Sequence, residues 1–259
     1  MKSLIVSSLF PKHAKRTTLY LMELFVNCNP NLTAIMNCYI CGEPSTSDEH
    51  APARGFFPKG KRNQLITVRS CAKHNEDTSK DDEYVRNVIV MSLGNNTVAL
   101  DHFKDKGISS FNHSPALMVE TTGVRKTVLI QEKKDELTST YALKIDRKRI
   151  DFILSKIAYA LFFWKYKTPW NRALNIATEF LLTEDQDTDD LLSNLIQEAK
   201  EFDHLLNYEG TNPDIFQFVF ISSEETDPHD QILRLKFYEG FEAWILPISG
   251  SDGPLWEKP

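Results

Sequence analysis

Cysteine is scarce in this chain of 259 residues, which contains only Cys28, Cys38, Cys41 and Cys71. A disulfide framework of the secreted kind would need more cysteines in a chain of this size. The apolar segment at residues 4–10 is short and no clear small-residue cleavage site follows it, so a signal peptide is not expected. The scarcity of cysteine predicts a reducing compartment, and we expect a cytoplasmic protein.

Long hydrophobic runs and an excess of positive charge are also missing. The most apolar stretch, residues 157–164, is much shorter than the roughly 18 residues that a membrane-spanning helix needs. We therefore expect a soluble protein with no membrane contact. Because the formal net charge is −6, any contact with nucleic acid must depend on a local basic patch.

Apolar periodicity predicts an α+β fold. Helical spacing of apolar residues covers 81–93 and 147–165, and two further helices are expected at 171–182 and 188–206. Short β-like runs predict strands at 126–131, 141–145, 215–222, 232–238 and 241–246. The last three of these strands are expected to form a small antiparallel sheet.

Changes in composition divide the chain into three segments. Residues 37–82 are rich in Cys, His, Gly, Pro and basic residues, which is typical of loops and short strands around a metal. Residues 1–35 are expected to be a loosely ordered N-terminal extension, because Met36 stands directly before the first metal-like motif. We expect a metal module at 36–105 and a C-terminal α+β domain for target or partner binding at 106–259.

Two short motifs predict a structural zinc site. Cys38 and Cys41 are separated by two residues and followed by glycine, and Cys71 and His74 have the same spacing. Zinc prefers four such ligands in a tetrahedron, so the pairs predict a Cys3His site for Zn²⁺. The alternative is a set of buried free cysteines with a surface histidine. Cys28 lies outside the pattern and has no assigned role.

Acidic, histidine and asparagine residues accompany these metal motifs. The segment Asp48-Glu49-His50-Ala51-Pro52 lies between the two pairs, Asn75 follows the second pair, and Ser79-Lys80-Asp81 comes shortly after it. Together with the zinc pairs, this order resembles the HNH (ββα-metal, treble-clef zinc) endonucleases. The resemblance implies a zinc-stapled ββα-metal module that hydrolyses phosphodiester bonds of DNA with Mg²⁺ or Mn²⁺.

The resemblance also assigns roles to residues. His50 would accept the proton of the attacking water, and Glu49 and Asn75 would bind the catalytic cation. The family usually has a further asparagine on the strand that leads into the second zinc pair; Asn63 offers it here, or Gln64 in another register. His74 stands where many relatives have cysteine, an exchange that zinc tolerates.

Basic residues around these motifs would contact DNA phosphates without reading sequence. They are Arg54, Lys59, Lys61, Arg62, Arg69, Lys73 and Lys80. The alternative is that these charges only keep a loop solvated.

Two functions remain open at this stage. The first is an HNH endonuclease, with restriction or phage defence as a plausible setting and with a partner protein or a homodimer as possible assemblies. The second is a non-catalytic zinc-stapled module that binds nucleic acid or protein and in which His50 is only structural. Metal-dependent cleavage that requires His50 separates them.

Overall fold

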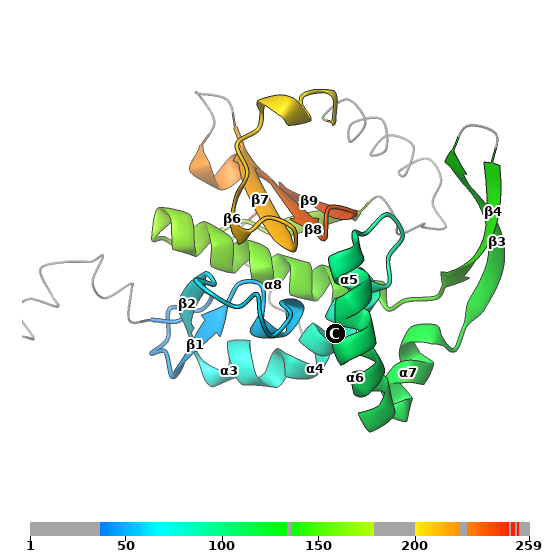
Figure 1. The fold of residues 1–259 in the computed structure, drawn as a ribbon. Coiled ribbons are helices and arrows are strands. Elements are labelled where there is room, and N and C mark those ends of the chain that lie inside the picture. The colour runs from blue at the N-terminus through cyan, green and yellow to red at the C-terminus, as the bar shows by residue number, and fades with distance from the viewer. Residues whose placement is uncertain are drawn as a thin grey trace, which may run out of the picture.

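The computed structural model describes residues 37–133, 136–178, 200–222, 227–248, 250–251 and 253. The extension expected at 1–35 and most of the helix expected at 188–206 lie outside these residues. The described residues form a mixture of helices and small antiparallel sheets, as the sequence predicted (Figure 1).

A short β-hairpin and a helix form the N-terminal part. Strand β1 (Ser47–His50) pairs antiparallel with β2 (Thr67–Ser70), and η1 (Arg54–Phe56) lies in the long connection between them. The chain continues through α3 (Ala72–Asn75) and η2 (Glu76–Thr78) into α4 (Ser79–Val90). Helix α4 confirms the helix expected at 81–93, although it begins and ends earlier. Its apolar side chains are buried, and acidic residues occupy its first turn, where the helix dipole favours them.

Four short helical segments follow. They are α5 (Thr97–His102), the π-helical turn η3 (Phe103–Gly107), α6 (Ile108–His113) and α7 (Pro115–Thr122). Asn96 caps α5 by accepting a hydrogen bond from the Ala99 amide, and Ser114 caps α7 in the same way. A Cβ atom at Gly107 would lie 2.3 Å from the Phe103 ring, so the turn at η3 requires glycine.

A two-stranded ribbon projects from the helices in Figure 1. It pairs β3 (Arg125–Lys133) with β4 (Glu136–Leu143) in antiparallel register. Both strands expected in this region are confirmed, and both are longer than the sequence predicted.

Helix α8 (Arg147–Tyr166) lies between the N-terminal hairpin with α4 and the C-terminal sheet (Figure 1). It contacts α4 and β2 on one side and the sheet strands β5 and β9 on the other. Because neighbours cover it on both sides, the residues from Ile150 to Phe163 are mostly buried. This double contact explains the nearly continuous apolar run in its second half, and the helix expected at 147–165 is confirmed.

The C-terminal sheet has the strand order β5-β9-β8-β7-β6 and is antiparallel throughout. Its strands are β5 (Leu174–Thr178), β6 (Glu209–Asn212), β7 (Phe216–Ile221), β8 (Ile232–Phe237) and β9 (Phe241–Pro247). Short turns η4 (Asp203–Leu205) and η5 (Pro228–Asp230) lie in the connections. The three strands predicted after residue 213 are confirmed.

The helix predicted at 171–182 is wrong at its centre, where the chain forms strand β5. Ile176 and Ala177 lie opposite Ile245 and Trp244 of β9. Both residues are buried, so pairing and burial at the sheet edge determine the local structure. A short apolar segment fits either periodicity, and tertiary contacts decide between them.

One hydrophobic core extends from Cys38 to Ile245. The predicted boundary near residue 105 falls within η3, and core residues on both sides of it belong to the same cluster. Among the described helices, none has both the length and the apolar composition needed to cross a bilayer.

Candidate metal centre and adjoining pocket

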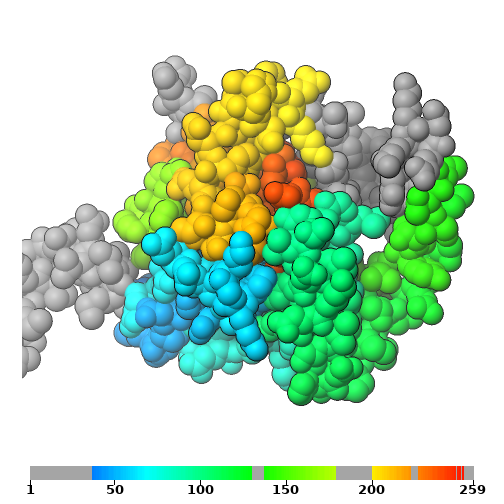
Figure 2. All heavy atoms as spheres, in the orientation of Figure 1, coloured from blue at the N-terminus to red at the C-terminus, as the bar shows by residue number. Residues whose placement is uncertain are grey.

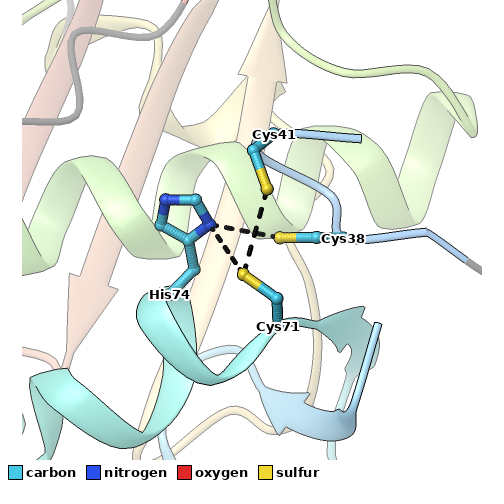
Figure 3. Close-up of side chains that lie close together, drawn as sticks. All are labelled: Cys38, Cys41, Cys71 and His74. Carbon is cyan, nitrogen blue, oxygen red and sulfur yellow. Dashed lines mark hydrogen bonds between the residues drawn. The ribbon is translucent and has the colours of Figure 1, made fainter. Parts of the chain in front are cut away.

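The side chains of Cys38, Cys41, Cys71 and His74 converge on one point (Figure 3). Their ligand atoms all lie within 4.8 Å of one another. The His74 Nδ1 atom is 3.3 Å from Sγ of both Cys38 and Cys71, and the sulfurs of Cys41 and Cys71 are 3.9 Å apart. Ligands at usual zinc distances stand about 3.5 to 3.8 Å apart in a tetrahedron. The predicted Cys3His group therefore has the donor set and the spacing to hold a metal ion such as zinc.

Local backbone geometry places these four ligands. Gly42 has a φ of +70°, which glycine adopts without strain, and its amide donates to the Cys38 carbonyl at 2.9 Å. This turn brings Cys38 and Cys41 to the same side. On the other half, Cys71 precedes α3 and His74 lies in the last turn of that helix. Burial opposes the Cys38 thiolate, but hydrogen bonds from His74 and from backbone amides lower the pKa of this thiol to about 5, which favours the form that binds metal.

A cavity of about 450 Å³ lies at the end of β1 and beside α4. Its lining includes Glu49, His50 and Asn75, the three residues that the HNH resemblance assigns to catalysis and cation binding. Asn75 directly follows His74, so one short helix carries residues of both the Cys3His group and the cavity.

His50 is the last residue of β1 and lies opposite Thr67 of β2. Its side chain is partly buried. Burial and the positive charge of Arg54 lower the pKa of the imidazole, and Asp48 offsets part of this effect. The ring is therefore neutral at pH 7, which is the form that can accept a proton.

Glu49 points away from solvent and binds a lysine from the C-terminal half. Its Oε1 atom lies 2.5 Å from Nζ of Lys156, and Oδ2 of Asp82 lies 3.0 Å from the same nitrogen. Lys156 also donates to the Thr78 hydroxyl at 2.6 Å, so its three protons all have partners. The side chains of Lys156 and Glu49 are only 3% and 4% exposed. Burial raises the pKa of both carboxyl groups, and the ammonium opposes this shift.

Sequence reasoning interpreted Lys156 as a residue of the helix surface or of a second nucleic-acid contact, whereas the structure buries it against Glu49. The sequence did contain a signal for this burial, because Lys156 is the one lysine between Ile150 and Phe163, the stretch of α8 in which most residues are apolar and buried. A lysine in such a place must find a carboxylate or lose its charge, but the sequence does not say which carboxylate it meets.

Asn75 is oriented by its amide nitrogen. Nδ2 donates to the Ser47 hydroxyl at 2.9 Å and to the Asp48 carbonyl at 3.3 Å. These bonds leave the amide oxygen as the atom that can act as a ligand. Together with the carboxylates of Glu49 and Asp82, it offers the oxygen donors that Mg²⁺ prefers. The hydroxyl of buried Tyr39 also lies beside the Glu49 carboxylate and interacts with it.

The residues proposed to orient His50 are not at the cavity. Asn63 and Gln64 are exposed in the loop before β2, which begins only at Thr67. The Gln64 carbonyl accepts a hydrogen bond from Thr211, and neither side chain lines the cavity. The assignment of Asn63 to the catalytic set is therefore not supported by the geometry, because β2 begins four residues after Asn63.

The residues predicted to contact DNA divide into those without a partner interaction described below and those that bind other groups of the protein. Arg54 and Lys80 line the cavity, and Lys59 and Lys73 are exposed. The others are engaged within the protein: Lys61 with Asp214, Arg69 with Asp48, and Arg62 with the Phe57 carbonyl.

Sequence reasoning also missed two cations that line the cavity, Arg86 and Lys106. Helical spacing could have indicated the first, because Arg86 is four residues after Asp82 and therefore lies on the same face of α4. Lys106 comes from η3, far along the chain, and no local pattern places it there.

Comparison with models of known families, with curated proteins and with solved structures found no match for the chain. The function must consequently be argued from the arrangement of residues. That arrangement consists of a Cys3His centre and an adjacent cavity whose lining includes a histidine, five acidic residues and four cations.

Proposed function

We propose that the chain is an HNH-type endonuclease that hydrolyses phosphodiester bonds of DNA. The observation that carries this proposal is one cavity that brings Glu49, His50 and Asn75 together beside the Cys3His group. These are the positions to which the HNH motif assigns the cation ligands and the general base. The hairpin followed by helix α4, with His50 at the end of the first strand, supports the proposal, because the motif implies a ββα order of elements.

The zinc centre has a structural role in this proposal. It joins the loop before β1 to α3, two segments that have few apolar residues of their own and are separated by more than 30 positions. Metal binding and local folding then form one equilibrium. Because Asn75 follows His74, the zinc centre also fixes the position of one cavity residue.

The chemistry requires a base, charge neutralisation and a positioned phosphate. His50 Nε2 or Nδ1 takes a proton from water as the water oxygen forms its bond to phosphorus. The bond from phosphorus to the leaving oxygen breaks, and the leaving oxygen ends with a proton from solvent. A divalent cation held by Glu49, Asn75 and Asp82 would supply stabilisation of the charge on the phosphate and on the leaving oxygen.

Nicking of supercoiled plasmid in Mg²⁺ or Mn²⁺ tests the proposal. We expect the wild-type protein to nick DNA and His50→Ala to lose at least a hundredfold in rate, the lower range for a general base. His113→Ala is the matched control, because His113 is exposed on α6 and outside the cavity. Zinc content is measured in each preparation. Equal rates in wild type and His50→Ala would contradict the assignment of the base.

A second function is favoured by the ion pair at Glu49. Lys156 already provides a positive charge to Glu49 and Asp82, so one of their two negative charges is balanced without a divalent cation. The alternative is a non-catalytic zinc module that binds nucleic acid or protein. It predicts no nicking with any divalent metal, together with binding of DNA that His50→Ala leaves unchanged.

Several broader features belong to the proposal alone. A role in restriction or phage defence, and a homodimer in which each site cuts one strand, are consistent with an HNH endonuclease. Sedimentation with and without a DNA duplex would test the dimer.

A further inference from the structure

Two cations in the cavity converge on a glycine. Lys106 extends from η3 and Arg86 from α4, and both meet Gly55 of η1. A Cβ atom at Gly55 would lie 3.6 Å from Lys106 Nζ and 3.8 Å from Arg86 Nη1. In the space-filling view, the cyan surface that follows β1 lies beside the green surface of the α5–α6 region (Figure 2). Three separate segments therefore bring two positive charges to one point where no side chain fills the space.

Among the described residues, Glu83 is the carboxylate that pairs with Arg86, and it also acts on the charge of Lys106. Within the described residues, Lys106 makes no hydrogen bond and no ion pair. The Arg86 side chain is only 4% exposed; its Nε and Nη2 atoms bind Asn87 Oδ1, and Glu83 is 3.5 Å from Nη2. Nη1 is the guanidinium nitrogen nearest to Gly55 and is left available. Burial lowers the pKa of Lys106, the neighbouring charges of Arg86 and Arg62 lower it further, and Glu83 opposes part of this shift.

Five acidic residues line the cavity; Glu76 is exposed, and the other four have partners within the protein. Glu49 and Asp82 bind Lys156, and Asp48 binds Arg69. Glu83 accepts a hydrogen bond from Ser110 at 2.5 Å besides its contact with Arg86. The cavity thus has an acidic side near β1 and a cationic side near Gly55, and the cationic side lacks a full counter-charge.

We propose that Gly55, Arg86 and Lys106 form a binding subsite for a phosphate group. A guanidinium and an ammonium are the side chains that bind phosphate most strongly, and a residue without a side chain lets the phosphate oxygens approach. Resting on the proposed function, the phosphate belongs to a nucleic-acid strand and is held in the same cavity as His50. Free inorganic phosphate has the same chemistry and serves as the probe.

Calorimetric titration with inorganic phosphate, at low ionic strength and in the full-length protein, tests the subsite. We expect Lys106→Ala to weaken phosphate binding about ten- to a hundredfold, the value of one charge-assisted hydrogen bond. Lys104→Ala is the matched control, since Lys104 lies in the same π-helical turn, is paired with Asp101 and does not line the cavity.

Gly55→Glu provides a second variant that does not remove a cation. Its carboxylate would lie beside Lys106 and Arg86 and compete with the ligand, so phosphate binding should be lost while zinc content and circular dichroism stay unchanged. Equal phosphate affinity in wild type, Lys106→Ala and Gly55→Glu would overturn the subsite, as would wild-type protein that binds no phosphate.

The same variants separate the subsite from the nuclease. A single-stranded oligonucleotide that competes with phosphate in wild type but not in Lys106→Ala would identify the strand as the source of the phosphate. Competition without cleavage would preserve the subsite and contradict the nuclease. Cleavage that is equal in Lys106→Ala and wild type would preserve the nuclease and contradict the subsite.

Discussion

Replacing Lys156 with methionine tests the ion-pair network beneath the cavity. Methionine has similar length but no charge, so Lys156→Met leaves Glu49 and Asp82 as two buried carboxylates without a cation. Breaking a buried pair by removing one partner costs about 3 to 5 kcal/mol. This is a large part of the roughly 5 to 15 kcal/mol by which a domain is stable.

The assay is denaturant unfolding, with Lys165→Met as the control. Lys165 lies on the same helix and pairs with Glu209 at 2.7 Å, but both side chains are about one-third exposed. Such a pair contributes about 0 to 1 kcal/mol. Lys156→Met should therefore be several times more destabilising than Lys165→Met. Adding Glu49→Gln to Lys156→Met should recover part of the loss, because it removes one uncompensated charge.

Magnesium adds a second readout to the same experiment. If Lys156 supplies the charge that a divalent cation would otherwise bring to Glu49 and Asp82, Mg²⁺ should stabilise Lys156→Met more than the wild type. Equal destabilisation by Lys156→Met and Lys165→Met would refute the reasoning. A stabilised Lys156→Met protein would equally refute it, since the carboxylates would then carry no penalty.

Three further changes have expected outcomes. Chelation should release zinc from the Cys3His group and lower the melting temperature, and Cys71→Ser should do the same. Metal analysis together with calorimetry measures both effects. An unchanged melting temperature after complete zinc removal would contradict the prediction. The pKa of His102 is lowered to about 4, chiefly by burial and then by Arg86 and Lys106, so the unfolded chain binds this proton at a higher pH than the folded chain does. Up to about 3 kcal/mol of stability should therefore be lost as pH falls from about 6.5 to about 4. In unfolding curves measured across this range, His102→Asn, whose amide can still donate to Tyr238, should reduce the dependence of stability on pH. A Cβ atom at Gly240 would lie 2.3 Å from the Gly94 carbonyl carbon, whereas one at Gly60 meets nothing within 4 Å. In the same unfolding assay, Gly240→Ala should therefore lower the free energy of unfolding by about 1 to 3 kcal/mol, and Gly60→Ala should lower it much less.

The parts of the fold that the sequence predicted well are those with local signals. Helices α4 and α8 repeat apolar residues at helical spacing over several turns, and β7, β8 and β9 are bounded by turn residues. The Cys3His group is also local, because each half is a pair of ligands two residues apart.

The parts that the sequence missed depend on contacts between distant segments. Strand β5 exists because β9 offers it a partner, although its own residues fit a helix equally well. The position of Asn63 depends on where β2 begins, and a difference of a few residues removes it from the cavity. Periodicity contains no information on either point, since both are set by tertiary packing.

The difference between local signals and contacts of distant segments also explains why the sequence revealed only part of the site. The resemblance to HNH endonucleases singled out Glu49, His50 and Asn75, which lie within 27 positions of one another. The charges that surround them come from further along the chain: Arg86 from α4, Lys106 from η3 and Lys156 from α8. Because Lys156 is buried against Glu49 and Asp82, the acidic side of the cavity is complete only when α8 is packed in place. The C-terminal half therefore contributes directly to the electrostatics of the cavity, besides any role it has in choosing a target or a partner.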